Sequence, residues 1–186
     1  MNIKSTEIPD LLIIEPKVFE DPRGYFFESF NERVLEENRL NYKFVQDNQS
    51  KSVYGVIRGL HYQIEPYSQT KLIRVLQGTI LDVVVDIRKG SPNFGDVFTL
   101  ELSDENKRQL LVPKGFAHGF SVISQTAVVL YKCDEFYNKE SERGIFFNDP
   151  DLKIDWQIDM KHAVVSEKDR ILPPFKNAEN NFNFKG

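Results

Sequence analysis

The sequence predicts an all-β protein, an antiparallel jelly-roll β-barrel or sandwich with short flanking helices. Its 186 residues include 15 Phe and 7 Tyr, along with many Val and Ile, and these residue types favour strands. Gly and Pro interrupt the apolar runs at short intervals, as expected of many short strands. The chain is long enough to bury a sizeable core as one domain, residues 1–186, and it shows no internal repeat or linker.

The predicted elements follow one another with turn signals between them. The first apolar run, 11–19, ends at a turn, and a second strand covers 24–30. Asn31 is a good N-cap for a short amphipathic helix over 32–38. The remaining strands are expected at 43–49, 53–63, 71–76, 79–88, 96–102, 108–113, 119–124 and 126–137.

Two short segments complete this prediction. Gln77-Gly78 lies between two apolar runs and predicts a tight hairpin that pairs them. The tail, 176–186, is rich in Asn and is expected to be frayed surface.

Composition and charge exclude several classes of protein. The net charge is −4 and the pI is about 5.5, so no basic face is expected and nucleic acid is not a predicted partner. The scattered Lys and Arg residues still permit a small anionic ligand. The single cysteine, Cys133, suits a reducing compartment. No segment resembles a signal peptide or a membrane span, so we expect a soluble, cytoplasmic protein with no membrane partner.

His61 is the most informative position for function. It lies in Val56-Ile57-Arg58-Gly59-Leu60-His61-Tyr62-Gln63, where the apolar pattern predicts a buried strand. An imidazole can accept and return a proton at neutral pH, as a general base must. The alternative is a histidine that is simply hydrogen-bonded in the core or on the surface. The polar residues described next favour the base.

Alternation of side chains along strands puts two polar groups on apolar faces. Tyr131 has small apolar neighbours on its face, so its phenol either projects into a cavity or packs in the core with its hydroxyl bonded. Lys71 also lies on an apolar face, where an ammonium needs a partner. That partner is either a ligand anion or enolate oxygen, or one of Asp82 and Asp86, which share a face of their own strand.

Alternation places Arg58 and His61 on opposite faces of a regular strand. Gly59 between them offers a place for a β-bulge that would bring both into one pocket. The sequence by itself leaves both arrangements open.

A second motif argues against a metal site. Pro113-Lys114-Gly115-Phe116-Ala117-His118 resembles the second motif of the cupins, which are small jelly-roll barrels. Metal-binding cupins carry His-x-His and a downstream Glu in their first motif, whereas this chain has His61-Tyr62-Gln63, and Glu65 lies in a loop with Pro. Because a transition-metal site needs about three protein ligands, no metal is expected.

Seven fragments in order, from about residue 16 to residue 169, resemble the dTDP-4-dehydrorhamnose 3,5-epimerases. The fragments are Arg58-Gly59-Leu60-His61-Tyr62-Gln63, Lys71-Leu72-Ile73-Arg74-Val75, Val85-Asp86-Ile87-Arg88-Lys89-Gly90-Ser91-Pro92, Gly115-Phe116-Ala117-His118-Gly119-Phe120, Tyr131-Lys132-Cys133, Asn148-Asp149-Pro150 and Ser166-Glu167-Lys168-Asp169. The resemblance implies a cupin-type homodimer that uses neither metal nor cofactor. It also implies inversion of the carbons beside the 4-keto group of a nucleotide-linked 6-deoxysugar.

The resemblance assigns the reacting groups. His61 matches the base, which Asp169 orients and makes more basic. Tyr131 matches the residue that returns a proton from the other side of the ring, and Lys71 the residue beside the sugar's 4-oxygen. A proton next to a ketone is weakly acidic, so its removal needs both a base and stabilisation of the enolate oxygen. Without the resemblance, Asp169 would be interpreted as part of a solvated charge run.

The resemblance also implies the binding residues. Arg58 and Lys168 are candidates for the diphosphate, and His118 either lines the pocket near the sugar or orients His61. The third histidine, His162, is expected on the surface.

The remaining matched residues concern the nucleotide. Arg23, Phe26 and Glu28 match a segment that in the family reaches the nucleotide partly from the partner subunit. Gln46 and Asn48 match the pair that helps to recognise the base.

Several alternatives remain. Relatives with this fold act at C3 only, or on sugars and heptoses carried by GDP. A ketoisomerase or a non-catalytic sugar-binding cupin is less favoured, because neither needs a base and an acid on opposite sides of a ring, and this chain carries both, His61 and Tyr131.

Overall fold

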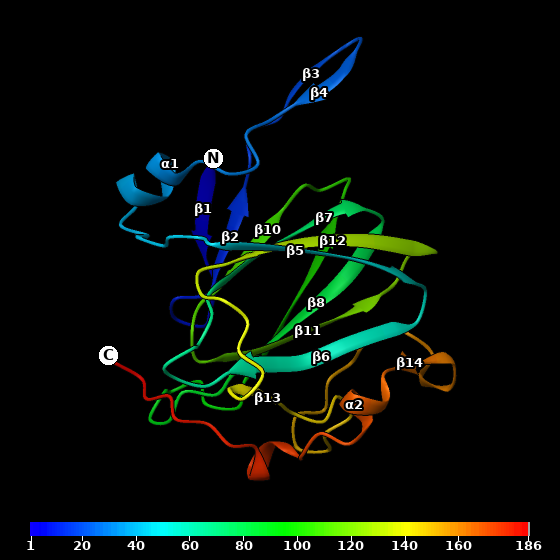
Figure 1. Ribbon diagram of the computed structural model, residues 1–186. Helices are drawn as coiled ribbons and strands as arrows, with labels where there is room; N and C mark the ends of the chain where they lie inside the picture. The colour runs from blue at the N-terminus through cyan, green and yellow to red at the C-terminus, as the bar shows by residue number, and fades with distance from the viewer. Residues whose placement is uncertain (186) are drawn as a thin grey trace.

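The structure is a computed structural model that describes residues 1–185, and two antiparallel sheets face each other in its body (Figure 1). The first sheet consists, in spatial order, of β1 (Asn2–Ser5), β2 (Leu12–Glu15), β10 (Gln109–Val112), β7 (Lys71–Gln77), β12 (Thr126–Cys133) and β5 (Gln46–Val53). The second consists of β13 (Glu142–Gly144), β6 (Val56–Gln63), β11 (Phe116–Val122), β8 (Thr79–Asp86) and β9 (Val97–Ser103), with the short β14 (Val164–Val165) parallel to β6. The predicted all-β, jelly-roll-type fold is confirmed.

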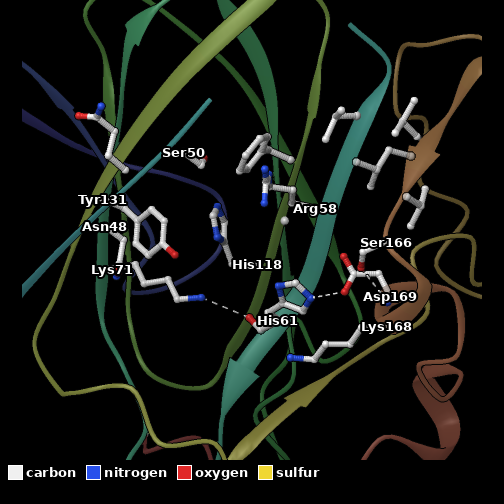
Figure 2. Close-up of a pocket in the computed structure, with 17 residues that line it drawn as sticks. Asn48, Ser50, Arg58, His61, Lys71, His118, Tyr131, Ser166, Lys168 and Asp169 are labelled. Atoms are coloured by element: carbon white, nitrogen blue, oxygen red, sulfur yellow. Dashed lines mark hydrogen bonds and ion pairs between the residues drawn. The ribbon is translucent and has the colours of Figure 1, made fainter. Parts of the chain in front are cut away.

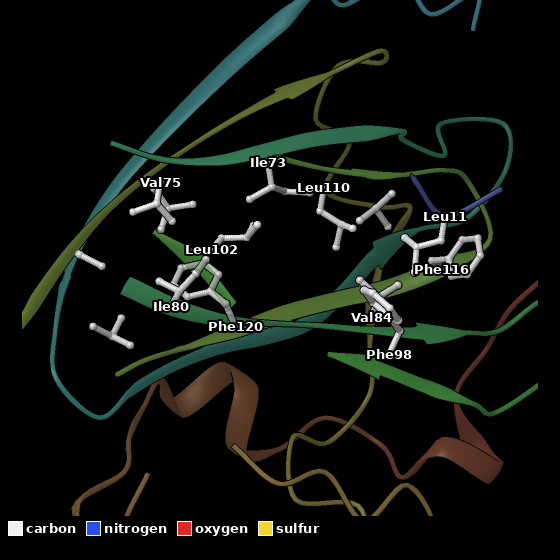
Figure 3. Close-up of a cluster of buried hydrophobic side chains, with 14 of the residues drawn as sticks. Leu11, Ile73, Val75, Ile80, Val84, Phe98, Leu102, Leu110, Phe116 and Phe120 are labelled. Atoms are coloured by element: carbon white, nitrogen blue, oxygen red, sulfur yellow. The ribbon is translucent and has the colours of Figure 1, made fainter. Parts of the chain in front are cut away.

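The main core lies between the sheets because alternate side chains of both sheets point inward. From β8, Ile80 and Val84 point inward and join Ile73 of β7 in one buried cluster (Figure 3). The outward residue Val83 packs in a second buried cluster, together with the C-terminal segment. Because both faces of β8 are covered, residues 80–86 are all buried.

Short helices flank the sheets, as predicted. Asn31 caps α1 (Glu32–Glu37), and its side-chain oxygen accepts the Val34 N–H at 3.4 Å. Leu35 of α1 is buried against the outer face of the first sheet, where it meets Leu72. The C-terminal segment carries η1 (Met160–His162), α2 (Glu167–Arg170) and η2 (Phe175–Asn177).

The first two predicted strands are wrong in extent. Residues 11–19 divide between β2 and β3 (Phe19–Asp21), and β3 pairs with the short β4 (Gly24–Phe26). This hairpin, with the chain up to residue 28, stands away from the body (Figure 1) and is called the arm below. Residues 19–26 are all exposed, so no buried face prolongs the strands.

The predicted hairpin at Gln77-Gly78 is also wrong. The turn itself is present, with Gly78 at φ 78°, but it joins strands of different sheets, β7 in the first and β8 in the second. Both edges of β7 are taken by β10 and β12. A side chain at Gly78 would collide with the Thr126 carbonyl, because its Cβ would lie 2.0 Å from that oxygen.

The prediction of a frayed tail is wrong for the segment around Phe182, which packs against the body, and Gly186 lies outside the described residues. Phe182 is 6% exposed in the outer cluster of the second sheet. The Lys89 N–H donates to the Phe182 carbonyl, and the Phe184 N–H donates to the Lys89 carbonyl. Phe182 and Phe184 lie among the Asn residues and provide apolar surface to bury, which the overall composition of the tail did not indicate.

Candidate functional site

A cavity of about 640 Å³ opens between the two sheets (Figure 2). Its walls come from β5, β7 and β12 on one side and from β6 and β11 on the other. The segment from β14 to α2 closes a further side. Strands far apart in the sequence therefore meet around one space, as is usual for binding sites in barrel mouths.

His61 lies on β6, where it faces both the cavity and Asp169. Its Nε2 lies 2.7 Å from Asp169 Oδ1, and its side chain is 31% exposed. The other ring nitrogen, Nδ1, points toward the part of the cavity that holds Lys71 and Tyr131 (Figure 2). The contact with Asp169 is the one through which Asp169 is predicted to orient His61.

Asp169 reaches His61 because Ser166 begins α2. Ser166 Oγ accepts the Asp169 N–H at 3.1 Å, and the Asp169 carboxylate accepts the Gly59 N–H at 3.3 Å. Burial by itself would raise the pKa of Asp169, but the hydrogen bonds from His61, Gly59 and Ser166 hold it below the ordinary value. Asp169 thus remains an anion that can stabilise a protonated imidazole.

Of the two arrangements that the sequence left open, the structure has the bulge at Gly59. In the pairing of β6 with β11, His61 is opposite His118 but Arg58 is opposite Phe120, so the register shifts between them. Gly59 has φ 122°, which only glycine adopts readily. Arg58 and His61 consequently line the same cavity.

Tyr131 and Lys71 point into the cavity from the opposite sheet (Figure 2). Burial raises the pKa of the Tyr131 phenol, so Tyr131 stays protonated. Burial also lowers the pKa of Lys71, whose Nζ donates to the His61 carbonyl at 3.4 Å. Of the two interpretations of Tyr131, the structure favours the cavity.

Asp82 and Asp86 are engaged elsewhere. His118 Nε2 lies 2.9 Å from Asp82 Oδ2, and Arg88 donates to Asp86 Oδ2 at 2.7 Å. Within residues 1–185, no ion pair is formed by Lys71. A ligand anion or enolate therefore remains the candidate partner for its ammonium.

The other predicted binding residues divide into two groups. Arg58, Lys168, Asn48 and His118 line the main cavity. Gln46 lines an adjoining cavity of about 390 Å³ that shares Asn48 with the main one, and Gln46 Nε2 donates to Asn48 Oδ1 at 3.1 Å.

Sequence reasoning missed Tyr137 and Glu142, which line the adjoining cavity together with Gln63 and Gln69. Glu142 accepts the Tyr137 hydroxyl at 2.8 Å and forms an ion pair with Lys168. Burial favours a higher pKa for Glu142, but these two partners and His61 hold it below its ordinary value. Neither residue interrupts an apolar face, so alternation gave no signal for them.

The arm residues Arg23, Phe26 and Glu28 do not reach either cavity of their own chain. The side chain of Arg23 is 89% exposed and pairs with Asp21 at 2.6 Å, and Phe26 is 67% exposed. His162 is exposed, as predicted.

The described residues, 1–185, contain no group of three or more His, Cys, Asp or Glu side chains arranged to hold a metal ion. In the same range, no helix is both long and apolar enough to cross a membrane.

Comparisons with known proteins agree with the resemblance. A sequence model of the family described as dTDP-4-dehydrorhamnose 3,5-epimerase matches residues 5–177. The chain is 55% identical to the enzyme of that name from Shigella flexneri over 170 residues, which cover 91% of this chain and 93% of the relative.

Two solved structures are similar to the whole fold. That of dTDP-4-dehydrorhamnose 3,5-epimerase from Elizabethkingia anophelis has a TM-score of 0.91 and 54% identity, and covers 95% of this chain and 97% of its own. The Legionella pneumophila dTDP-6-deoxy-D-glucose-3,5-epimerase, in complex with dTDP-4-keto-L-rhamnose, has a TM-score of 0.90 and 48% identity, and covers 95% and 93%. This chain belongs to the dTDP-4-dehydrorhamnose 3,5-epimerase family.

Proposed function

We propose that this chain inverts C3 and C5 of a dTDP-linked 4-keto-6-deoxysugar, with His61 as the base and Tyr131 as the acid. The observation that carries the proposal is the geometry of the main cavity. The imidazole Nδ1 of His61 faces it from one sheet, while the Tyr131 phenol and the Lys71 ammonium face it from the other (Figure 2).

The first half of each inversion removes a proton. Nδ1 of His61 takes the proton from the carbon beside the ketone, and the C–H electron pair moves to the 4-oxygen as an enolate. Asp169, at 2.7 Å from Nε2, stabilises the imidazolium. The Lys71 ammonium stabilises the enolate oxygen, which is worth most in a site shielded from water.

The second half returns a proton to the opposite face. Tyr131 donates its hydroxyl proton to the carbanionic carbon as the enolate collapses to the ketone. Its raised pKa keeps the phenol protonated until that step. The tyrosinate and the imidazolium then exchange protons with solvent, which restores both groups for the next inversion.

Arg58 and Lys168 are the proposed diphosphate ligands, because both cations border the cavity beside the reacting groups. Arg58 Nε donates to Ser52 Oγ at 3.1 Å, which leaves its terminal nitrogens for a bidentate contact. Gln46 and Asn48 are the proposed base-recognition pair. His118, held by Asp82, is proposed to line the sugar subsite.

The proposal includes a homodimer. The arm carries Arg23, Phe26 and Glu28 away from its own cavity and exposes aromatic side chains. A two-fold arrangement would let each arm close the nucleotide end of the partner's cavity. We also propose a cytoplasmic location, in agreement with the free Cys133, and a product that enters rhamnose-containing surface polysaccharides.

Solvent exchange tests the reaction directly. Incubation with dTDP-4-dehydro-6-deoxyglucose in D₂O should place deuterium at both C3 and C5 and yield the inverted sugar. Deuterium at C3 alone would mean a C3 epimerase, and preference for a GDP-linked substrate would revise the nucleotide. If no 4-keto sugar nucleotide incorporates deuterium, the chain is better explained as a non-catalytic sugar-binding cupin. Because the proposed chemistry uses no metal, activity should survive prolonged chelation.

A further inference from the structure

The C-terminal tail contacts the two strands that carry His61 and Glu142, from the side opposite the cavities. Alternation sends His61 of β6 inward and its neighbour Tyr62 outward. On β13, Glu142 likewise faces the adjoining cavity, and its neighbour Arg143 faces the tail. The two strands are paired, with Arg143 opposite Tyr62.

Glu179 holds both outward neighbours. Its carboxylate accepts Arg143 Nε at 2.7 Å, and its main-chain carbonyl accepts the Tyr62 hydroxyl at 2.6 Å. Phe182 packs edge-on against the Tyr62 ring, with 6.3 Å between centroids. One tail residue thus joins β6 to β13 behind the site.

Arg143 transmits this contact to the backbone around Glu142. Its Nη1 donates to the Glu140 carbonyl at 2.7 Å and to the Glu142 carbonyl at 2.9 Å. The side chain of Glu142 in turn binds Lys168 and the Tyr137 hydroxyl. An unbroken chain of contacts therefore connects Glu179 to a proposed diphosphate ligand.

We infer that Glu179 is a positioning residue for the epimerase site, acting through Arg143 to hold Glu142 and Lys168 in place. The inference rests on the proposed function. Glu179 lies beyond residue 177, where the match to the family's sequence model ends, whereas its partners Arg143 and Tyr62 lie within the match.

The test compares Glu179→Ala and Arg143→Gln with Lys176→Ala. The control breaks another exposed ion pair of the same segment, Lys176 with Asp151 at 3.1 Å, which lies away from the cavities. Because the Glu179–Arg143 pair is partly exposed, its loss should raise KM about two- to fivefold, with kcat changed less. The double variant should be no worse than either single one, because both remove the same contact, and Lys176→Ala should keep the KM of the unaltered chain.

Hydrogen exchange gives a second readout that needs no turnover. Glu179→Ala should speed exchange of the amides of 138–144, and Lys176→Ala should not. Faster exchange with an unchanged KM would reduce the contact to a structural role and overturn the inference, as would a KM rise shared by Lys176→Ala. If Glu179→Ala does not fold, Glu179→Gln is measured in its place. If the unaltered chain is inactive, the proposed function is contradicted instead. Amide hydrogen exchange alone would then decide whether Glu179 holds residues 138–144 in place.

Discussion

The predicted site has two parts that differ in their structural support. The reacting groups lie in the main cavity, and some of the predicted nucleotide-binding residues lie on the arm. Around the cavity, His61, Lys71 and Tyr131 project from paired strands of two packed sheets, and the chain neighbours of His61 and Lys71 are buried. On the arm, Arg23 and Phe26 project from a two-stranded hairpin that contacts little else (Figure 1). One chain positions all three reacting groups, whereas the proposed role of the arm requires the cavity of a partner subunit.

The difference in structural support corresponds to a difference in proposed role, catalysis in the cavity and substrate binding on the arm. A base and an acid must be held within a fraction of an ångström of their productive geometry, which strands inside a sandwich can ensure. An exposed hairpin can gain order when it docks, at an entropic cost. Changes in the cavity should therefore alter the rate of the reaction, and changes in the arm should alter binding.

Replacing the base should have the largest effect. His61→Ala should lower kcat by about 10²–10⁴-fold and abolish deuterium exchange, because a general base contributes about that much. Stopped assays with dTDP-4-dehydro-6-deoxyglucose would measure both. His162→Ala is the matched control, since His162 also pairs with an aspartate, Asp159 at 3.1 Å, but on the surface. Retention of more than a tenth of the activity in His61→Ala would assign the base elsewhere.

Replacing the acid should separate exchange from inversion. Tyr131→Phe keeps His61 and Lys71, so the proton can still leave and return on one face, while delivery to the opposite face fails. We expect inversion to fall about 10²-fold, within the range for general acid catalysis, and exchange to fall less. Tyr42→Phe, which changes a tyrosine packed in the cluster around α1, is the control. An equal loss of exchange and inversion would contradict the assigned role.

The arm should affect substrate binding and leave stability unchanged. Arg23→Ala combined with Phe26→Ala should raise KM about tenfold, which corresponds to about 1.4 kcal/mol. Both side chains are exposed in the single chain, so the melting temperature of the monomer should not change. Light scattering would measure the dimer in the same samples. A monomer with full activity, or an unaltered KM in the double variant, would remove the arm from the site.

The sequence predicted the cavity better than the arm for a physical reason. Lys71 and Tyr131 are polar residues on apolar faces, and Gly59 lies between Arg58 and His61, so alternation already included a pocket and a bulge among the arrangements that it left open. Nothing local marks Glu142, whose place depends on the pairing of β13 with β6. The extent of the arm strands depends on tertiary partners, which a propensity pattern does not contain.

The prediction of a hairpin at Gly78 was wrong for the same reason, since strand pairing depends on tertiary partners. The turn chemistry at this glycine was correctly interpreted, but a turn does not determine which strands pair. β7 is bordered by β10 and β12, and β8 is bordered by β9 and β11, so neither strand has a free edge at which the other could pair. The tail was misjudged because two phenylalanines outweigh several asparagines once they have a surface to pack on.

The smallest effect at neutral pH should come from the titration of Lys71. Burial lowers its pKa, so as pH rises Lys71 loses its proton before an ordinary lysine would, and the enolate loses its cation. Burial raises the pKa values of the neighbouring Tyr131 and Cys133, and the charge of a Cys133 thiolate would favour the charged ammonium of Lys71. The nearby carboxylates Asp82 and Glu142 favour the charged ammonium and limit the shift. Activity should therefore fall on the alkaline side.

Lys71→Arg tests this assignment because a guanidinium stays charged throughout that range. The variant should be slower at its optimum, since a planar fork does not reproduce the position of an ammonium, but its alkaline fall should disappear. Profiles of kcat between pH 6 and about pH 10.5, the upper end being near the ordinary lysine value, would show the difference. An alkaline fall of unchanged position in Lys71→Arg would mean that another group titrates, and that the enolate is stabilised by something other than the lysine of β7.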